Sequence, residues 1–320
     1  MLPIIIGGGL LLWIGTSLGI TALGTAVLLI VLEVTLSFDN AVVNAGVLRH
    51  MSSRWQKRFL TWGILVAVFG TRAILPISIV AISSWTNPLV IAWMAVADSE
   101  QYSMLLNAAH YTINAFGGMF LVMVAFKYFF NEDKERHWIQ IVEQFLSRLG
   151  NIQAIETMLS LAVVAVLALA SPEHSIEILV AGLIGIGLFI SIQAIIGRLE
   201  TRAGTVAKSG LALFVYLNVL DAAFSLDSVV GAFALSTNVL IIMVGLGIGA
   251  YFVRSLTLLL VRHGTLDELI YIEHGAHWAI LGLAVAMLAA LFVEVPQPIT
   301  GFIGFAFLAL AYLSSRRALR

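Results

Sequence analysis

The chain consists of apolar runs, each about as long as a bilayer is thick, separated by short charged or turn-rich breaks. A helix that crosses the hydrocarbon core of a membrane needs about 20 such residues. Only 11% of the residues are charged, whereas soluble globular chains carry about 25%. The chain lacks the charge that a water-facing surface requires, so we expect an all-α polytopic membrane protein.

The apolar runs predict ten membrane spans. The first run, Leu2 to Ile20, has no basic residue before it and no small-residue cleavage pattern after it, so we expect a retained helix rather than a signal peptide. The predicted spans cover residues 2–20, 22–48, 58–83, 104–129, 157–171, 176–197, 209–232, 237–261, 269–293 and 298–315.

The basic residues orient these spans. Two of the 17 Lys and Arg, Arg72 and Arg254, fall deep within spans. With the N-terminus inside, the other 15 all lie on the inner side: Arg49, Arg54, Lys57, Arg58, Lys127, Lys134, Arg136, Arg148, Arg198, Arg202, Lys208, Arg262, Arg316, Arg317 and Arg320. This is the distribution that the positive-inside rule requires. We therefore predict both termini in the cytoplasm and a place in the plasma membrane, in a bacterium the cytoplasmic membrane.

The longest polar stretch, residues 131–156, joins the fourth and fifth predicted spans. Trp138, Val142, Phe145, Leu149 and Ile152 recur in it at helical spacing. This spacing predicts either an amphipathic helix on the inner membrane surface or an ordinary cytoplasmic linker helix.

A motif occurs twice. Glu-Val-Thr-Leu-Ser-Phe-Asp-Asn begins at Glu33, and Asp-Ala-Ala-Phe-Ser-Leu-Asp-Ser begins at Asp221. Further residues recur in the same order after each copy: Gly63 and Gly245, Arg72 and Arg254, His110 and His274, Gly118 and Gly282. Because the two copies lie in spans of opposite direction, we predict two inverted five-helix repeats, residues 1–171 and 176–320. Inverted repeats are typical of transporters that bind their substrate near the membrane midplane.

Six charged residues fall deep within the spans, away from their ends. The acids are Glu33, Asp39, Asp221 and Asp227, and the bases are Arg72 and Arg254. Charges at this depth are costly and normally mark an ion or substrate path. Four acids and two arginines sum to −2, which one divalent cation or the protonation of two acids would neutralise. Alternation between these two states would be metal/proton exchange. The alternative is a set of buried ion pairs that only fix helix packing, such as Asp39 with Arg72 and Asp227 with Arg254.

The other polar residues of the motifs, Asn40, Ser37, Ser225 and Ser228, also carry oxygen donors. Oxygen donors suit Mg²⁺, Ca²⁺ and Mn²⁺. A nitrogen from His110 or His274 would favour Mn²⁺, although a lone histidine in a span is often only a hydrogen-bonding partner. The chain has no cysteine, so disulfides and Cys zinc sites are excluded. No prosthetic group is expected.

The spacing of the motif predicts a local break in the helix. Glu33, Ser37 and Asn40 share one face of a straight helix, as do Asp221, Ser225 and Ser228, whereas Asp39 and Asp227 lie about 120° away. An unwound turn at Ser37–Asp39 or Ser225–Asp227 would let all four acids converge. We expect such a break in at least one copy.

The two motifs resemble the paired signature of the TerC/Alx family of integral membrane proteins. The resemblance covers most of the chain and implies an exporter fold related to LysE-type transporters, with efflux chiefly of Mn²⁺ and links to tellurite resistance and pH response. It also implies a metal site made of Glu33, Asp39, Asn40, Asp221, Ser225, Asp227 and Ser228. The chain departs from the family pattern in an additional N-terminal span and in Ser37.

The resulting prediction is a transporter that exports a divalent cation, Mn²⁺ first and Ca²⁺ or Mg²⁺ as alternatives, and that is not an enzyme. An intramembrane metal-dependent enzyme is the second reading, but the chain contains no His-Glu-x-x-His motif. An accessory protein that delivers metal to other membrane proteins is the third. The expected partners are the metal ion and the bilayer. The net charge of −1 gives no basis for nucleic-acid binding, and the oligomeric state stays open.

Overall fold

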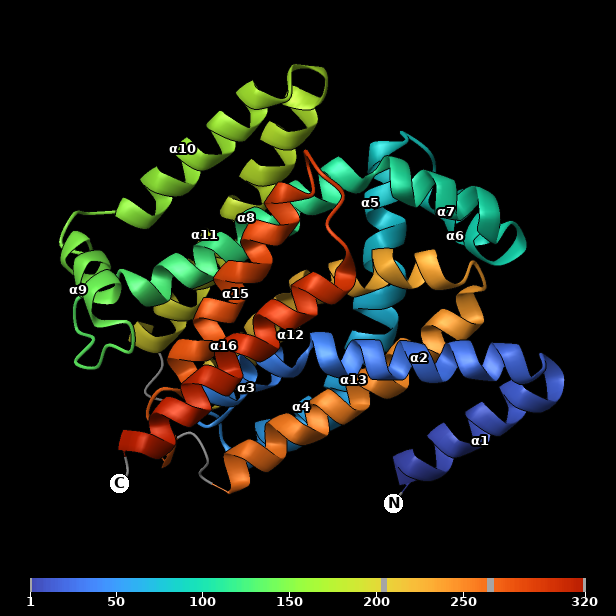
Figure 1. Ribbon diagram of the computed structural model, residues 1–320, viewed down its shortest axis with the longest axis horizontal. Helices are drawn as coiled ribbons and strands as arrows, with labels where there is room; N and C mark the ends of the chain where they lie inside the picture. Colours follow the sequence, from blue (N-terminus) through green and yellow to red (C-terminus); the bar gives the residue numbers. More distant parts are fainter. Residues whose placement is uncertain (1, 203–205, 264–267, 319–320) are drawn as a thin grey trace.

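The computed structural model describes residues 2–202, 206–263 and 268–318, and in these ranges all regular structure is helical (Figure 1). Arg320 lies outside the described residues, as do the side chains of Arg202 and Lys208. The elements are α1 (Leu2–Ser17), α2 (Ile20–Leu36), α3 (Phe38–Leu48), α4 (Ser53–Leu65), η1 (Val66–Ile74), α5 (Leu75–Ser83), α6 (Pro88–Ala97), α7 (Ser99–Ala108), α8 (His110–Phe129), α9 (Gln140–Leu149), α10 (Ile155–Ala170), η2 (Pro172–His174), α11 (Ser175–Arg202), α12 (Val206–Leu235), α13 (Val239–Arg262), α15 (Ile272–Ala289) and α16 (Gln297–Ala318).

Several of these helices are long and apolar enough to cross a membrane, which confirms a multi-pass membrane protein. The described residues contain 7 such helices. The number of candidate spans rises to 8 when the bent pair α2 and α3 is taken as one span. One of them is the continuous stretch Ser53–Ser83, in which η1 is a π-helical segment between α4 and α5. The helices α1 and α10 have 16 residues each. At 1.5 Å per residue each is about 24 Å long, which is shorter than a hydrocarbon core of about 30 Å.

The predicted helix break is present in the first motif. The axes of α2 and α3 differ by 52° across Ser37, whose φ of −103° and ψ of 15° depart from helical values. In the second motif, α12 runs without interruption through Asp221, Ser225 and Asp227. The break therefore occurs in one copy only.

Two short helices were not predicted. Residues 84–103 were treated as an outer connection, yet α6 and the first half of α7 lie there, and α8 begins at His110 rather than at residue 104. Both helices have capped N-termini: the Asn87 side chain accepts a hydrogen bond from Leu89 N at 2.9 Å, and Asp98 accepts one from Gln101 N at 3.1 Å. Asn and Asp are strong helix N-caps, so these starts were readable in the sequence.

In the polar stretch 131–156 the helix is shorter than predicted. It is the ten-residue α9, and residues 131–138 are irregular. Ile141, Val142 and Phe145 of α9 are exposed, whereas Glu143 is fully buried against the rest of the protein. The side of α9 that faces the rest of the protein thus carries the Glu143 carboxylate, and Val142 and Phe145 of the predicted apolar stripe face outward.

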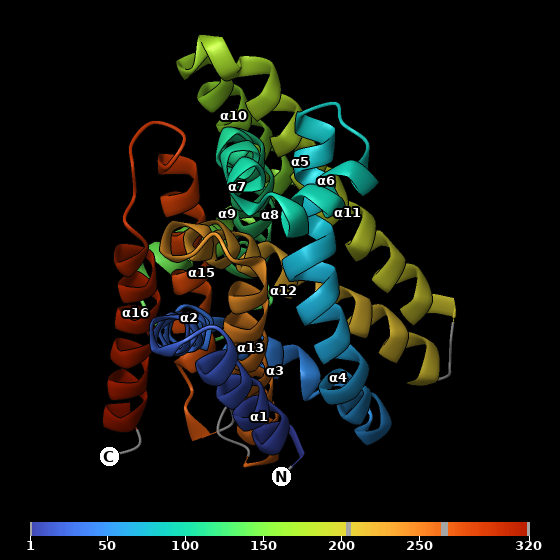
Figure 2. The same cartoon turned by 90° about the vertical axis from the view of Figure 1, so that its right-hand side faces the viewer.

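The break lies where elements of both halves of the chain meet. The helix α13 packs along α2 and α3, α15 packs between α8 and α16, and α12 contacts α2, α3, η1 and α8 (Figures 1 and 2). Glycines make the approach of α13 to α2 close, because a Cβ on Gly249 would lie 2.6 Å from the Cβ of Glu33. Small residues at such crossings are typical of packed membrane helices.

Candidate metal centre

Two of the four motif acids form buried ion pairs with the two arginines of the spans. Arg72 of η1 pairs with Glu33 of α2, and Arg254 of α13 pairs with Asp221 of α12, with 2.6 Å between Nη2 and Oδ2. Buried acid–arginine pairs, the alternative that the sequence left open, are therefore present, but the partners named for it, Asp39 with Arg72 and Asp227 with Arg254, were wrong. The first acid of each motif faces the helix that carries the arginine, so each guanidinium reaches that acid.

Each arginine is also held by its neighbours. Arg72 donates from Nη1 to the carbonyl oxygen of Ala67 at 2.7 Å. Arg254 donates to the carbonyl oxygen of Phe59 at 3.2 Å and to Asn218 Oδ1 at 3.3 Å, and its guanidinium lies 4.3 Å from the centre of the Phe59 ring. These contacts fix both guanidiniums inside the protein.

The polar residues around the break connect the two motif copies. Asn40 donates from Nδ2 to Asp221 Oδ1 at 2.8 Å, and this bond joins α3 to α12. Ser37 donates from Oγ to Glu33 Oε1 at 3.1 Å. In the second copy, Ser228 donates instead to the carbonyl oxygen of Ser225 in its own helix, at 3.0 Å.

The other two motif acids, Asp39 and Asp227, line one small cavity. Its wall is formed by Leu36, Asp39, Phe224, Asp227, Ser228, Leu283 and Thr300. The volume open to the centre of a water molecule is about 10 Å³. This is about the space that a single water molecule needs. Asp39 is buried and Asp227 is partly buried. Two carboxylates and two hydroxyls therefore face a space for one small species.

The break places Asp39 favourably for a charged group. Asp39 lies in the first turn of α3, where the helix dipole favours a negative charge. Its Oδ1 accepts a hydrogen bond from Asn40 N at 2.9 Å, and its Oδ2 lies against Gly304 of α16, whose missing side chain leaves room for it. Thr300 of α16 donates to Asp227 Oδ2 at 3.4 Å.

The four acids do not meet at one point. In the part of the chain that the structure describes, no group of three or more His, Asp or Glu side chains is close enough to hold a metal ion. The expectation that the break brings all four acids together was therefore wrong, because the arginines draw Glu33 and Asp221 away. Ser225 supplies only its carbonyl to Ser228, and it does not line the cavity.

The two histidines suggested as ligands lie elsewhere. His110 Nδ1 is 3.0 Å from the carbonyl oxygen of Asn107. His274 Nδ1 is 2.7 Å from Glu143 Oε2. Neither lines the cavity of Asp39 and Asp227. Both behave as hydrogen-bonding partners, which was the alternative reading.

Three functional candidates escaped sequence reasoning: Thr300, Asn44 and Glu143. Thr300 is an uncharged hydroxyl in an apolar run, which carries no signal. Among the described side chains, the buried oxygens Glu33 Oε2, Asn40 Oδ1 and Asn44 Oδ1 have no hydrogen-bond donor. Buried acceptors without donors are uncommon, and a cation or a water molecule would satisfy them.

Glu143 of α9, a helix outside the candidate spans, fastens α9 to the candidate span α15. Its carboxylate accepts hydrogen bonds from His274, from Lys134 Nζ at 2.9 Å and from Trp278 Nε1 at 2.9 Å. Burial on its own would raise the pKa of Glu143, but these hydrogen bonds outweigh it and hold the pKa well below its usual range. The ionised Glu143 therefore contributes its full stabilisation of the folded protein above the ordinary pKa of a glutamate. This contribution is lost only as the pH falls towards the lowered pKa of Glu143 in the folded state.

The family comparison covers most of this arrangement. A family model described as "Protein of unknown function (DUF475)" matches residues 38–320. The chain belongs to the DUF475 family. The DUF475 match includes Asp39, Asn40 and all of the second motif, and it begins after Glu33. No curated protein and no solved structure matches the chain. The function of this DUF475 member has to be inferred from its site.

Proposed function

We propose that this protein is a membrane transporter that exports a divalent cation, Mn²⁺ in the first place, in exchange for protons. One observation carries the proposal: Asp39 and Asp227, which hold the same position in the two motif copies, line one small cavity beside a broken membrane helix. Ser228 and Thr300 add hydroxyls. Carboxylates and hydroxyls are the donors that Mn²⁺, Mg²⁺ and Ca²⁺ prefer.

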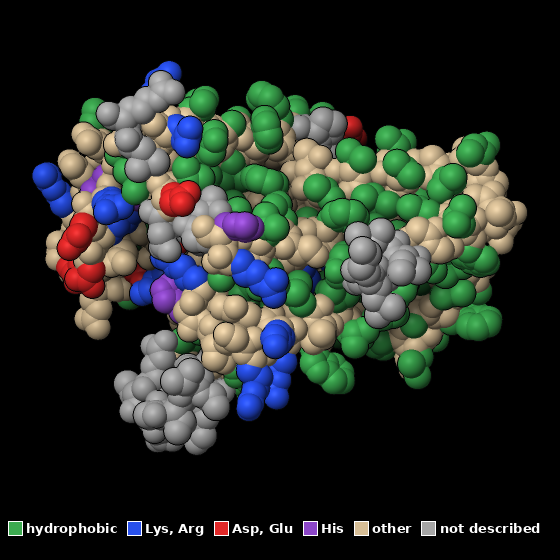
Figure 3. All heavy atoms as spheres, turned by 90° about the horizontal axis from the view of Figure 1, so that it is seen from below, with side chains coloured by type: hydrophobic (Ala, Val, Ile, Leu, Met, Phe, Trp, Pro, Cys, Tyr) green, Lys and Arg blue, Asp and Glu red, His purple; other side chains and the backbone are tan. Residues whose placement is uncertain are grey.

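The architecture proposed with this function is ten helices in two inverted repeats, residues 1–171 and 176–320. The matching ion pairs of the two motif copies support a repeat, since each first acid pairs with the corresponding arginine. The start of α1 and the end of α16 lie on the same side of the molecule (Figures 1 and 2). Lys and Arg gather on that side, seen from below (Figure 3). This supports cytoplasmic termini, and the membrane proposed with them is the plasma membrane.

The size of the cavity favours transport over catalysis. A metal-dependent enzyme needs room for a substrate beside its metal, whereas this cavity has space for about one water molecule. A broken helix at a buried polar site is also the arrangement by which transporters expose backbone and side-chain ligands to an ion. The resemblance of the motifs to TerC/Alx proteins points to the same cargo. A metal-delivery protein is the alternative that the experiment separates.

The proposal is tested by metal flux into proteoliposomes that contain the purified protein. The ions are Mn²⁺, Ca²⁺, Mg²⁺ and Zn²⁺, each with and without a pH gradient. Wild type is expected to transport Mn²⁺, and a pH gradient is expected to change the rate. Asp39→Asn and Asp227→Asn are each expected to lower the flux by roughly 100-fold, since the loss of even an outer-shell partner of a metal costs about 10–100-fold.

The matched control is Asp98→Asn, which also removes one carboxylate. Asp98 is exposed and caps α7, so this variant is expected to transport at the wild-type rate. Equal flux by Asp39→Asn and Asp98→Asn would overturn the site. Mn²⁺ binding to wild type without flux of any ion would overturn transport and favour delivery.

A further inference from the structure

A second cavity opens at the far end of α3 from the break. It has a volume of about 480 Å³ and lies among α3, α8, α11, α12 and α15. Seven of its lining residues have polar or charged side chains: Arg49, His50, Tyr128, Gln193, Tyr216, Glu273 and His277. Gln193 lies within the candidate span of α11, where a polar side chain is costly unless it faces water or a polar partner.

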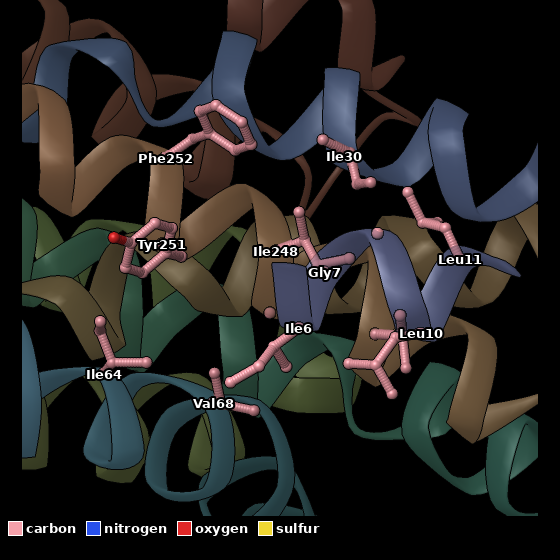
Figure 4. Close-up of a pocket in the computed structure, with 13 residues that line it drawn as sticks. Ile6, Gly7, Leu10, Leu11, Ile30, Ile64, Val68, Ile248, Tyr251 and Phe252 are labelled. Atoms are coloured by element: carbon pink, nitrogen blue, oxygen red, sulfur yellow. The ribbon is translucent and has the colours of Figure 1, made fainter. Parts of the chain in front are cut away.

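A groove of similar volume elsewhere shows the contrast. The groove between α1 and the α2, η1 and α13 bundle measures about 490 Å³. Among its lining residues only Tyr251 carries a polar side-chain atom (Figure 4). Apolar cavities stay dry, whereas polar ones hold water. The groove beside α1 is suited to lipid chains, whereas the cavity beside α3, although it also has apolar walls, offers several polar side chains to water and ions.

The polar cavity follows α3 towards the metal centre. Val43 and Gly46 line it and lie on the same face of α3 as Asp39, because they are four and seven residues further along the helix. His50, just past the end of α3, lines it as well. The 11 residues of α3 span about 16 Å. The cavity thus extends to within one helical turn of Asp39. None of the described residues lines both this cavity and that of Asp39 and Asp227, so side chains separate the two.

One acid and one base stand together in this cavity. Glu273 Oε1 lies 3.0 Å from Arg49 Nη2, and both side chains are about one-third exposed, at 29% and 34%. Gly46 makes this possible, since a Cβ there would lie 3.1 Å from Glu273 Oε1. The pair ties the end of α3 to α15, and α3 is the part of the broken helix that could move about Ser37. His277 Nδ1, 2.8 Å from the carbonyl oxygen of Glu273, is placed beside the same acid.

We propose that the cavity is an aqueous vestibule through which a hydrated divalent cation reaches the Asp39 and Asp227 cavity, and that Glu273 is the carboxylate that receives the cation. This inference rests on the proposed function. A cation bound at Glu273 competes with Arg49 for the carboxylate. Its arrival loosens the tie between α3 and α15 and lets α3 turn about the break, which joins the two cavities.

The absence of cysteine in the chain allows a direct test with single introduced cysteines. Val47→Cys reports on the vestibule and Val43→Cys on its deeper part. Val31→Cys is the matched control, since Val31 is 57% exposed on α2 and lines neither cavity. A charged, membrane-impermeant methanethiosulfonate is applied to the cytoplasmic side of membrane vesicles. Labelling of Val47→Cys is expected to be at least about tenfold faster than that of Val31→Cys, because only a hydrated thiol forms the reactive thiolate.

Mn²⁺ then tests the role of Glu273. It is expected to slow the labelling of Val47→Cys and Val43→Cys, and Glu273→Gln in the same backgrounds is expected to abolish this protection. Equal labelling of Val47→Cys and Val31→Cys, in variants that elute as wild type does, would overturn the vestibule. Protection that persists in Glu273→Gln would overturn the role of Glu273.

The flux assay keeps this inference separate from the proposed function. If the introduced cysteines stay unlabelled in a protein that transports Mn²⁺, the vestibule is rejected and the proposed transport function stands. If Mn²⁺ protects the cysteines from labelling but the protein shows no flux, the cation-binding vestibule is supported and the transport function is rejected.

Discussion

The two copies of the motif carry the same residue types and make the same ion pair, but their backbones differ. In the first copy the chain bends by 52° at Ser37, and in the second α12 continues for 30 residues. Glu33 and Asp221 each pair with an arginine of a later helix. The ion pair is therefore common to both copies, whereas the break occurs in the first copy only.

The last polar residue of each motif accounts for part of this difference. Asn40 reaches across to Asp221 of α12, whereas the shorter Ser228 bonds to a carbonyl oxygen of its own helix. Serine side chains inside a helix commonly bond to a carbonyl oxygen of the preceding turn, and α12 runs through Ser228 without interruption. The first copy thus uses its polar side chain to join α3 to α12, and the second uses it locally.

The largest expected effect comes from removing an arginine. Arg254→Met leaves the buried Asp221 without its guanidinium, and breaking a buried ion pair costs about 3–5 kcal/mol. Arg72→Met is expected to cost less, because Arg254 has additional contacts with Phe59 and Asn218. Thermal unfolding of the detergent-solubilised protein measures both.

The double variant Asp221→Asn/Arg254→Met is the control for this prediction. It removes the charge that the single variant leaves unpaired, so it is expected to recover part of the lost stability. An Arg72→Met variant that is less stable than Arg254→Met would show that the first ion pair, next to the break, is the more important one.

The second prediction exchanges the residue that distinguishes the copies. Asn40→Ser gives the first motif the residue of the second and removes the 2.8 Å bond to Asp221. A hydrogen bond to a charged group is worth about 1.5–3 kcal/mol, so the free energy of unfolding should fall by about that amount. Without this bond α3 is held less firmly against α12. Two cysteines introduced on facing sides of α3 and α12 are therefore expected to cross-link less efficiently in Asn40→Ser than in the parent protein. Unchanged stability would mean that Asn40 does not hold the two copies together.

Much of the site could be predicted from the sequence because a charge in an apolar run is conspicuous. This identified Glu33, Asp39, Asp221 and Asp227, and the helical spacing of the motif predicted the break at Ser37. The partner of each acid could not be predicted. Which arginine an acid meets depends on the direction in which the neighbouring helix presents its side chain, and a helical wheel of one span does not contain this.

The uncharged and short features were also missed for physical reasons. Thr300 and Asn44 are polar but uncharged, so nothing distinguishes them from the many hydroxyl and amide residues that only pack in membrane helices. The helices α6 and α7 have ten residues each, too few to give a span pattern, although Asn87 and Asp98 mark their starts. Hydropathy thus predicted a multi-pass membrane protein and made the acids conspicuous, and the three-dimensional contacts divided the acids into two sets.

The third prediction compares the two serines at the same motif position. Ser37 donates to the Glu33 carboxylate, whereas the Ser225 side chain does not line the cavity. Ser37→Ala is expected to lower the free energy of unfolding by about 1 kcal/mol, the usual net value of a hydrogen bond, and to slow Mn²⁺ flux because the break is less well defined. Ser225→Ala is expected to retain wild-type flux. Equal losses of flux in both variants would show that the break gives Ser37 no special role.

The smallest expected effect tests how closely α16 encloses Asp39. A Cβ on Gly304 would lie 3.3 Å from Asp39 Oδ2, so Gly304→Ala should displace the carboxylate by a few tenths of an ångström with little loss of stability. Since metal sites depend on ligand geometry, the Mn²⁺ concentration for half-maximal flux should rise, while the maximal rate should change little. Gly8→Ala is the matched control, because nothing lies within 4 Å of a Cβ there. If Gly304→Ala has the same half-maximal Mn²⁺ concentration as Gly8→Ala, then α16 does not position Asp39. The carboxylate would then be held in place by the first turn of α3 alone.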